Sequence, residues 1–429
     1  MPLQFAPTGV RRFFTTILAI CVTCVAALFA GPVSSGAMLL LLPGEMVPVE
    51  HGVSEDYEPL HKGRIDLGTG LYVRENEDLV VRGVPGLVLR RTYLSNYRVS
   101  RHFGVGTTHD GEVYLIGDGA RFQSASLILA TGTRINFARV SSGASVWNAL
   151  FEHQESARDW RGTRLGWTGT SWALRRPDGS LSLFKPCGGG GGSCSILKAR
   201  DADGHTILFR RDAGGRLVRM ETGPAWIAFE YDLASRVARA HSSARQEVRY
   251  EYDARGRLSR VVGHDGAVRR YTYTDADQMA TIVEPGTDIE NVYGADGRCI
   301  RQINRFPDDD DAEPYIFDFS YDVENGEVVR VETKRSDRTW SRYTFASRDV
   351  TSEAWGRAGT ELAAVAYVRD APTREISSLT LTCPDRTGRP LPHTSIVTDG
   401  NEEEITWGLL KTHCSRRQAT ASAVAPEPR

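Results

Sequence analysis

The sequence has no excess of charge of either sign, and it contains few methionines. Its 429 residues include 52 Lys and Arg against 54 Asp and Glu, which gives a formal net charge of −2. Because binding to a polyanion depends on clustered positive charge, this balance argues against a nucleic-acid partner. Five Met stand beside 42 Gly, a composition that favours a strand-rich fold with many turns over a helical bundle.

Standard catalytic signatures are missing as well. The chain has no Gly-x-Ser-x-Gly, His-Glu-x-x-His or phosphate-loop motif, and the glycine run 188–192 precedes no helical pattern. His102 and His109 are seven residues apart and could form a metal pair, or be ordinary histidines of a loop or sheet surface. The acidic run 308–311 lacks the alternation with Gly that a calcium loop needs, so we expect an exposed insertion. We predict a non-enzymatic protein with no catalytic residue, no cofactor and no metal.

The N-terminus is typical of an export signal. Arg11-Arg12 precede an uncharged, mostly apolar segment, Phe13–Ala30, and small residues follow. We predict a signal peptide over residues 1–37, followed by a linker over 38–60. Two alternatives remain open: an uncleaved membrane anchor, and lipidation at Cys21, where Ile20 is bulky for a lipobox. Apart from such an anchor, no membrane contact is expected.

Five cysteines follow the signal segment. Cys187 and Cys194 flank a short glycine-rich loop, and an oxidising compartment makes a disulfide between them the expected state. A metal pair is the alternative, but no nearby Cys or His completes a tetrahedral set. Cys383 with Cys414 is a looser pairing, which would leave Cys299 unpaired.

The strongest pattern is a repeat of about 21 residues, clearest at Tyr250-Glu251-Tyr252-Asp253-Ala254-Arg255-Gly256-Arg257-Leu258. The marker aspartates are 20, 21, 22, 21 and 26 residues apart. A fixed period of this size indicates a tandem array of one supersecondary unit. The residues that define it are Asp212, Gly215, Tyr231, Asp232, Tyr252, Asp253, Gly256, Tyr273, Asp275, Asp296, Tyr321 and Asp322.

Each unit is predicted to be a β-hairpin. Val248, Tyr250 and Tyr252 alternate with charged residues, as in a half-buried antiparallel strand. Asp253 can begin a type I turn, and Gly256 can take the left-handed conformation of a bulge. Asp-Gly pairs at 178–179, 203–204 and 265–266 favour two-residue turns between units. Because a lone hairpin is marginal in water, the hairpins should join into one twisted antiparallel sheet with its aromatic face covered.

The tandem Tyr-Asp-x-x-Gly-Arg-Leu pattern resembles the YD repeat of the Rhs family, which is shared with toxin-complex subunits and teneurins. Upstream, the segments 66–70, 77–79, 85–93 and 103–106 resemble the module that precedes the repeats in Rhs proteins. The resemblance implies an all-β protein. We expect an Rhs-like N-terminal β module over 61–174, a YD-repeat sheet over 175–350, a C-terminal cap over 351–414 and a disordered tail over 415–429.

The chain departs from the family pattern in ways that bear on function. Thr107 stands where the family has Trp, and neither a release motif nor a variable toxin domain follows the few, worn repeats. We predict an exported structural or interaction scaffold at the cell envelope with a protein partner. The alternatives are a truncated or split shell component of a polymorphic-toxin delivery system, a surface protein whose aromatic ladder binds a glycan, and a small nuclease-like toxin in residues 351–429.

Overall fold

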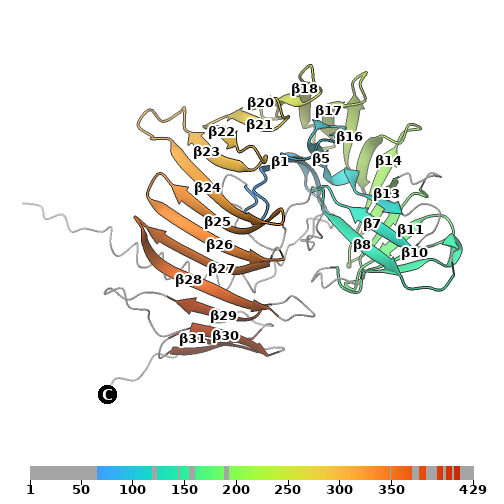
Figure 1. Ribbon diagram of the computed structural model, residues 1–429. Coiled ribbons are helices and arrows are strands. Elements are labelled where there is room, and N and C mark those ends of the chain that lie inside the picture. The colour runs from blue at the N-terminus through green and yellow to red at the C-terminus, as the bar shows by residue number, and fades with distance from the viewer. Residues whose placement is uncertain are drawn as a thin grey trace, which may run out of the picture. The chain divides into compact units, whose positions relative to one another are not determined.

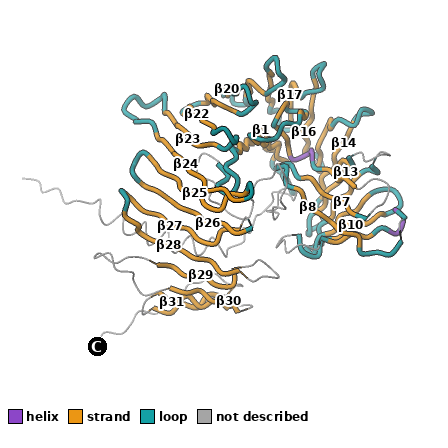
Figure 2. Tube along the Cα trace, in the orientation of Figure 1, coloured by secondary structure: helices purple, strands orange, loops and turns teal. Residues whose placement is uncertain are grey.

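The computed structural model describes residues 65–117, 123–143, 145–153, 160–187, 193–347, 349–369, 376–382, 394–399, 402–407 and 410–415. Within these ranges the protein is all-β, and its helical segments are two single turns of 3₁₀ helix, η1 (Asp110–Glu112) and η2 (Val146–Asn148) (Figures 1 and 2). No helix in this part of the chain is long and apolar enough to cross a membrane. The all-β fold predicted from the repeat is confirmed. The proposed signal and linker, and residues 416–429 of the proposed tail, lie outside the described residues.

A small antiparallel sheet follows the first described residues. Its strands β1 (Val73–Val81), β2 (Leu87–Leu94) and β5 (Thr107–His109) pair in the order β1–β2–β5. A short ribbon, β3 (Ser100–Arg101) with β4 (Gly104–Val105), connects β2 to β5. We call residues 65–113 the N-terminal sheet module.

The next eight strands form a closed ring of antiparallel pairings. Each strand from β6 to β13 pairs with its neighbour in sequence, and β13 pairs back with β6. The strands are β6 (Tyr114–Gly117), β7 (Ser124–Ile128), β8 (Arg134–Arg139), β9 (Leu150–Glu152), β10 (Arg164–Trp167), β11 (Trp172–Arg175), β12 (Leu181–Phe184) and β13 (Cys194–Arg200). Phe137, Phe151 and Phe184 are among its largest fully buried side chains.

From β13 onward the strands pair in strict sequence order up to β27, as Figure 1 shows for the row from β14 to β27. These strands are β14 (Thr206–Arg211), β15 (Leu217–Thr222), β16 (Ala225–Tyr231), β17 (Val237–Ser242), β18 (Glu247–Tyr252), β19 (Leu258–Val262), β20 (Val268–Tyr273), β21 (Met279–Glu284), β22 (Thr287–Tyr293), β23 (Cys299–Arg305), β24 (Tyr315–Glu324), β25 (Glu327–Arg335), β26 (Thr339–Ala346) and β27 (Asp349–Arg357). The hairpins therefore join edge to edge into one sheet.

The alternation within each strand separates a covered face from a solvated face. On β18, Val248 and Tyr250 are buried, whereas Arg249 and Glu251 are exposed. The N-terminal sheet module covers part of the buried face, because β1 packs against β16, β17 and β18, and β2 packs against β15 and β16. Burial of these aromatic and aliphatic side chains is the main stabilising term for the sheet.

The chain continues with β28 (Thr360–Arg369). The strands β29 (Ile376–Thr382), β30 (Thr394–Asp399), β31 (Glu402–Trp407) and β32 (Leu410–Ser415) belong to a second compact unit, distinct from the one that contains β1 to β27. Within the second unit, β29 to β32 pair in sequence order as an antiparallel meander.

Candidate functional site: the repeat ladder and its junction with the N-terminal sheet module

The turn at Asp253 shows how one repeat is built. The Asp253 N–H donates to the Arg257 carbonyl at 2.9 Å, and the Gly256 N–H donates to the Asp253 carbonyl at 3.0 Å. Asp253 Oδ1 accepts the N–H groups of Arg255 and Arg257, each at 2.9 Å. Gly256 has a φ of +79°, and the strand register shifts between Glu251 and Tyr252. The predicted bulged turn is present, and its left-handed residue explains why Gly recurs.

Asp212 and Asp232 begin turns of the same kind. The Oδ1 atom of Asp212 accepts the Arg216 N–H at 2.9 Å, and that of Asp232 accepts the Arg236 N–H at 2.8 Å. Gly215 supplies the left-handed residue in the first turn, whereas Ser235 takes that role in the second with a φ of +61°.

Three arginines connect each turn to the next repeat. Arg216, Arg236 and Arg257 each form an ion pair of 2.7 Å with the aspartate four residues earlier. The same guanidinium groups lie over the rings of Tyr231, Tyr252 and Tyr273, at 4.9, 4.5 and 4.7 Å from the ring centres. The Asp-Arg pair therefore positions a cation on the tyrosine of the following hairpin.

Each tyrosine then bonds back to the repeat before it. The hydroxyls of Tyr231, Tyr252, Tyr273, Tyr293 and Tyr321 donate to the carbonyls of Leu217, Val237, Leu258, Met279 and Cys299, at 2.6 to 2.8 Å. Burial raises the pKa of each of these five tyrosines, so the hydroxyls keep the proton they donate. This tyrosine ladder gives the 21-residue period its physical basis, because each step needs one tyrosine and one carbonyl per repeat.

Two later marker aspartates lie at other turn positions than Asp253. Thr274, not Asp275, begins the fourth turn, since its N–H donates to the Gln278 carbonyl at 2.8 Å and its Oγ1 accepts the Gln278 N–H at 3.2 Å. In the fifth turn the first position is Gly294, and Asp296 lies two residues later. Asp296 nevertheless forms an ion pair of 2.6 Å with Arg298, so this turn also has an Asp-Arg pair, although its aspartate is the third residue of the turn and not the first.

Asp322 begins no turn. It lies inside β24, opposite Arg330 of β25, with which it forms an exposed ion pair of 2.6 Å. The hairpin closes instead at Asn325 and Gly326, whose φ values of +51° and +84° match a two-residue type I′ turn.

The Asp-Gly pairs do not form two-residue turns. The Gly179, Gly204 and Gly266 N–H groups donate to Arg176, Asp201 and Gly263, three residues earlier, and only the glycine of each pair has a positive φ. A type I′ turn needs a positive φ at both central residues. These turns therefore repeat the bulged geometry of Asp253, and the two-residue interpretation was wrong.

The N-terminal sheet module meets the repeats through a buried ion pair. Arg91 on β2 donates from Nε and Nη2 to the Asp78 carboxylate, the second bond being 2.9 Å, and both side chains are almost fully buried. The Tyr250 hydroxyl donates to Asp78 at 2.8 Å, and the Arg91 guanidinium lies 5.5 Å from the Tyr250 ring centre. The carboxylate is thus shared between the module and β18.

Backbone contacts continue this junction. The Val237 N–H donates to the His102 carbonyl at 2.7 Å, and the Val105 N–H donates to the Gly256 carbonyl at 3.2 Å. Gly104, with a φ of +86°, approaches the same carbonyl so closely that a Cβ would collide with it. On β2, the Tyr93 hydroxyl accepts the Met279 N–H at 2.8 Å. The motif-like segments upstream of the repeats therefore supply the groups that bind the repeat sheet.

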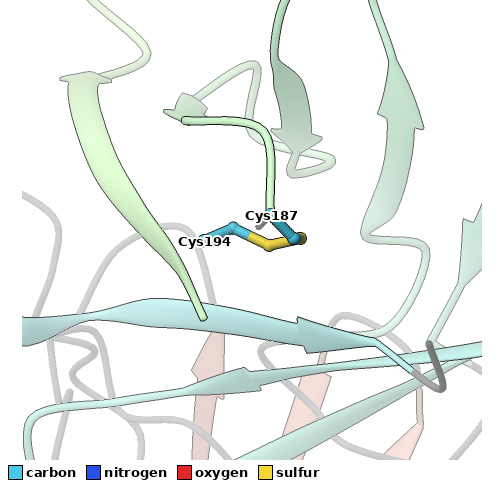
Figure 3. The surroundings of a disulfide bond; sticks show 2 residues. All are labelled: Cys187 and Cys194. Carbon is cyan, nitrogen blue, oxygen red and sulfur yellow. A yellow bond between two sulfur atoms is a disulfide. The ribbon is translucent and has the colours of Figure 1, made fainter. Parts of the chain in front are cut away.

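A disulfide joins Cys187 to Cys194 in the ring, with the Cα atoms 4.4 Å apart (Figure 3). Cys299 on β23 is a buried free thiol whose pKa is raised to about 12 by burial. Cys383 and the side chain of Cys414 are not among the described groups.

Sequence reasoning missed several groups that the structure brings together. It singled out the aspartates and tyrosines but not their arginine partners, although Arg follows Gly in the clearest copy. Asp78 and Arg91 lie in the segments 77–79 and 85–93, which entered only through the resemblance. Their opposite charges are the one signal in the sequence for the pairing. It treated His109 as a surface residue or metal ligand, whereas the side chain is fully buried.

The geometry defines a class: tandem β-hairpin proteins whose repeats are linked by tyrosines and covered by a separate sheet. Two family models match the sequence. A domain of unknown function, DUF6531, matches residues 62–137, and the RHS repeat matches residues 252–289. The match at residues 252–289 shows that the chain contains the Rhs/YD repeat that its sequence pattern resembles.

No curated protein matches the chain. Among solved structures, the crystal structure of TcdB2-TccC3 without its hypervariable C-terminal region is similar at 10% identity and a TM-score of 0.36, over 81% of this chain and 23% of that one. A Photorhabdus luminescens Tc holotoxin pore is similar at 11% identity and a TM-score of 0.24, over 83% of this chain and 25% of that one. The chain thus spans about a quarter of the length of these structures.

Proposed function

We propose that the protein is an exported, non-catalytic scaffold of the Rhs/YD type that binds a protein partner at the cell envelope. The observation that carries the proposal is that the ionisable side chains of the repeat are engaged in structural bonds. Each aspartate, arginine and tyrosine of the regular repeats is bonded within the turn or to the next hairpin. Groups that elsewhere serve as acids, bases or nucleophiles here hold the sheet together.

The solvated face of the repeat sheet is the surface such a scaffold offers. Its arginines form exposed ion pairs, for example Arg239 with Glu247 at 2.6 Å and Arg260 with Glu251. Exposed pairs of this kind add little to stability, so they are free to serve recognition. Arg249, with 70% of its side chain exposed, lies between them on the same face.

The test is capture from envelope fractions by the full chain. We expect a reproducible protein partner whose retention falls at least tenfold when Arg239, Arg249 and Arg260 are all changed to Gln, with an unchanged circular dichroism spectrum. An Asp275→Asn variant, altered at an exposed turn residue, is the matched control and should retain the partner. The proposal fails if no protein is retained, and binding to a glycan panel alone would favour the carbohydrate-binding alternative.

Export has its own test. Sequencing the N-terminus of the mature protein should find it shortened near residue 37, and mass mapping without reductant should find Cys187 bonded to Cys194. Protein from the native host that keeps Met1 and carries both thiols free would contradict export.

A split shell component of a polymorphic-toxin system is the second candidate, and the match to the RHS repeat favours it. An adjacent reading frame that continues the repeats, or a toxin and immunity pair, would support this role. A neighbourhood with neither would remove it.

A further inference from the structure

Two histidines and one carboxylate meet beneath the repeat sheet. His102 follows β3, His109 ends β5, and Glu112 is in η1, and one ligand-type atom from each lies within 4.8 Å of the others. His102 Nδ1 is 2.7 Å from Glu112 Oε1. His109 is fully buried, and its Nε2 has no hydrogen-bond partner, nor has the buried Glu112 Oε2.

This cluster lies at the junction between the N-terminal sheet module and the repeats. The His102 carbonyl accepts the Val237 N–H of β17, and its ring packs edge-on against Tyr231 at 5.4 Å. The His109 ring lies 5.6 Å from Phe229 on β16. A change in the charge of the His109 imidazole therefore acts directly on the contact between β5, η1 and strands β16 and β17.

The surrounding charges oppose a further positive charge. Glu112 is the one carboxylate in the cluster. The positive charge of Arg101 on β3 acts to lower the pKa of Glu112, and that of Arg211 on β14 acts to lower the pKa of His109. Asp110, the other acid of η1, acts on Arg90. Beyond Tyr231, Asp212 is paired with Arg216. A bound divalent cation would place still more positive charge among these groups in a site of low dielectric.

We propose that His102, His109 and Glu112 form a proton-operated latch, which closes the N-terminal sheet module onto the repeats at neutral pH and opens it on acidification. At neutral pH the neutral His109 is compatible with its apolar surroundings, and Glu112 holds His102. With His109 protonated, the Glu112 carboxylate faces an imidazolium group as well as the guanidinium groups of Arg101 and Arg211. The repulsion is relieved when the module separates from β16 and β17 and water reaches His109.

The titration of His109 agrees in sign with this geometry. Burial lowers the pKa of His109 to about 4, below the value of about 6.5 for an exposed histidine. The closed state therefore binds fewer protons than the open state. Its advantage is complete above about pH 6.5 and is lost as the pH falls towards 4.

Hydrogen exchange of the full chain tests the latch. The pKa of His109 is about 4 in the closed state and about 6.5 once the side chain is exposed. Between pH 7.5 and pH 5, this difference raises the equilibrium constant for opening of the latch roughly 30-fold. We expect that increase, after correction for the intrinsic exchange rate, in the amides of β5, η1 and β17, including Val237. The amides of β25 and β26 should change less than about threefold, since local openings are independent of one another.

Variants identify the responsible group. His109→Gln should reduce the response of β17 to less than about threefold, whereas His205→Gln, altered at a half-exposed histidine paired with Asp201, should keep the wild-type response. An unchanged response in His109→Gln, or none in the wild type, overturns the proposal.

Two measurements on the wild type do not depend on a variant that folds. The ¹³C resonance of His109 should titrate near pH 4 in the closed protein, and a midpoint near 6.5 would overturn the latch. Zinc chloride at neutral pH should leave the thermal midpoint unchanged. A rise with Zn²⁺ would show a cation site in place of a proton site.

Discussion

The first three repeats and the next two reach the same hairpin geometry with different side chains. In the turns at Asp212, Asp232 and Asp253, the aspartate forms an ion pair with an arginine, and that arginine lies over the tyrosine ring of the next hairpin. The turns at Thr274 and Gly294 lack that aspartate, yet Tyr293 and Tyr321 keep their bonds to the preceding repeat. The tyrosine bond is therefore the common element of the array. The ion pair made by a first-position aspartate is absent at Thr274, and the Asp296–Arg298 pair replaces it in the turn at Gly294.

In the later repeats, where the Asp-Arg pattern is incomplete, side-chain amides form the corresponding hydrogen bonds. Gln278, at the position of Arg257, donates from Nε2 to the Gly297 carbonyl at 2.7 Å. Buried Asn291 donates to the Met279 carbonyl at 3.1 Å and accepts from Gln302 at 2.8 Å. The later repeats thus contain a buried amide network where the earlier ones have arginines at the turn. The N-terminal sheet module bonds to both regions, since Tyr93 also accepts the Met279 N–H.

The largest expected effect is at the junction over the earlier repeats. Asp78→Ala leaves Arg91 buried without its partner, and we expect a loss of about 3–5 kcal/mol in the free energy of unfolding. Chemical denaturation of the variant and wild type measures it. Asp318→Ala, which breaks the exposed pair with Arg301, is the control and should cost less than about 1 kcal/mol. A loss that small for Asp78→Ala would show that the pair is not essential.

The second prediction concerns the tyrosine ladder. Tyr252→Phe removes the hydroxyl that donates to the Val237 and His102 carbonyls, and Tyr293→Phe removes the one that donates to the Met279 carbonyl. We expect Tyr252→Phe to cost about 1–2 kcal/mol, and Tyr293→Phe less, because the Met279 carbonyl keeps the Asn291 amide as a donor. A measurable loss in both variants would support a ladder common to both regions. A negligible loss for Tyr293→Phe alone would limit the ladder to the earlier repeats.

The third prediction concerns the left-handed turn position. Gly256→Ala should cost about 1–2 kcal/mol, since a Cβ is strained at a φ of +79° even though space is available. Ser235→Gly should be neutral or stabilising by up to about 1 kcal/mol, because it relieves that strain at some cost in chain entropy. Thermal unfolding of both variants measures the pair. A stabilising Gly256→Ala would contradict the turn geometry.

The hairpin array was predictable because its signals are local. The alternation around Tyr250 and the Asp-x-x-Gly spacing at Asp253 act within a few residues, so a single sequence carries them. The closed ring of β6 to β13 was not predictable, since its closure depends on the pairing of Cys194 with Leu115, 79 positions apart in the chain. The same holds for Asp78 with Tyr250: no periodic pattern connects them, and only the packing of β1 on β18 does.

The marker aspartates differ in a way that the sequence alone obscured. Asp253 directly follows Tyr252, whereas Asp275 lies two residues after Tyr273. The bulge at Tyr273 therefore places Thr274, and not Asp275, first in the turn. The register is fixed by the tyrosine, whose hydroxyl must reach the Leu258 carbonyl. A repeat aligned on tyrosine therefore predicts the turns better than one aligned on aspartate.

The smallest expected effect is a difference in stability between variants of Asp253 and Asp275. Burial acts to raise the pKa of Asp253, but hydrogen bonds from the Arg257 N–H and guanidinium outweigh it and lower that pKa. The contribution of Asp253 is therefore present above its unfolded pKa of about 3.9 and is lost as the pH falls through the lower folded value. Asp253→Asn should cost less than about 1 kcal/mol at pH 7, and the cost should be smaller at pH 2. Asp275→Asn should be neutral at both values. Denaturation curves at the two pH values make the comparison, and an equal cost for both variants at pH 7 would place the two aspartates in equivalent turns.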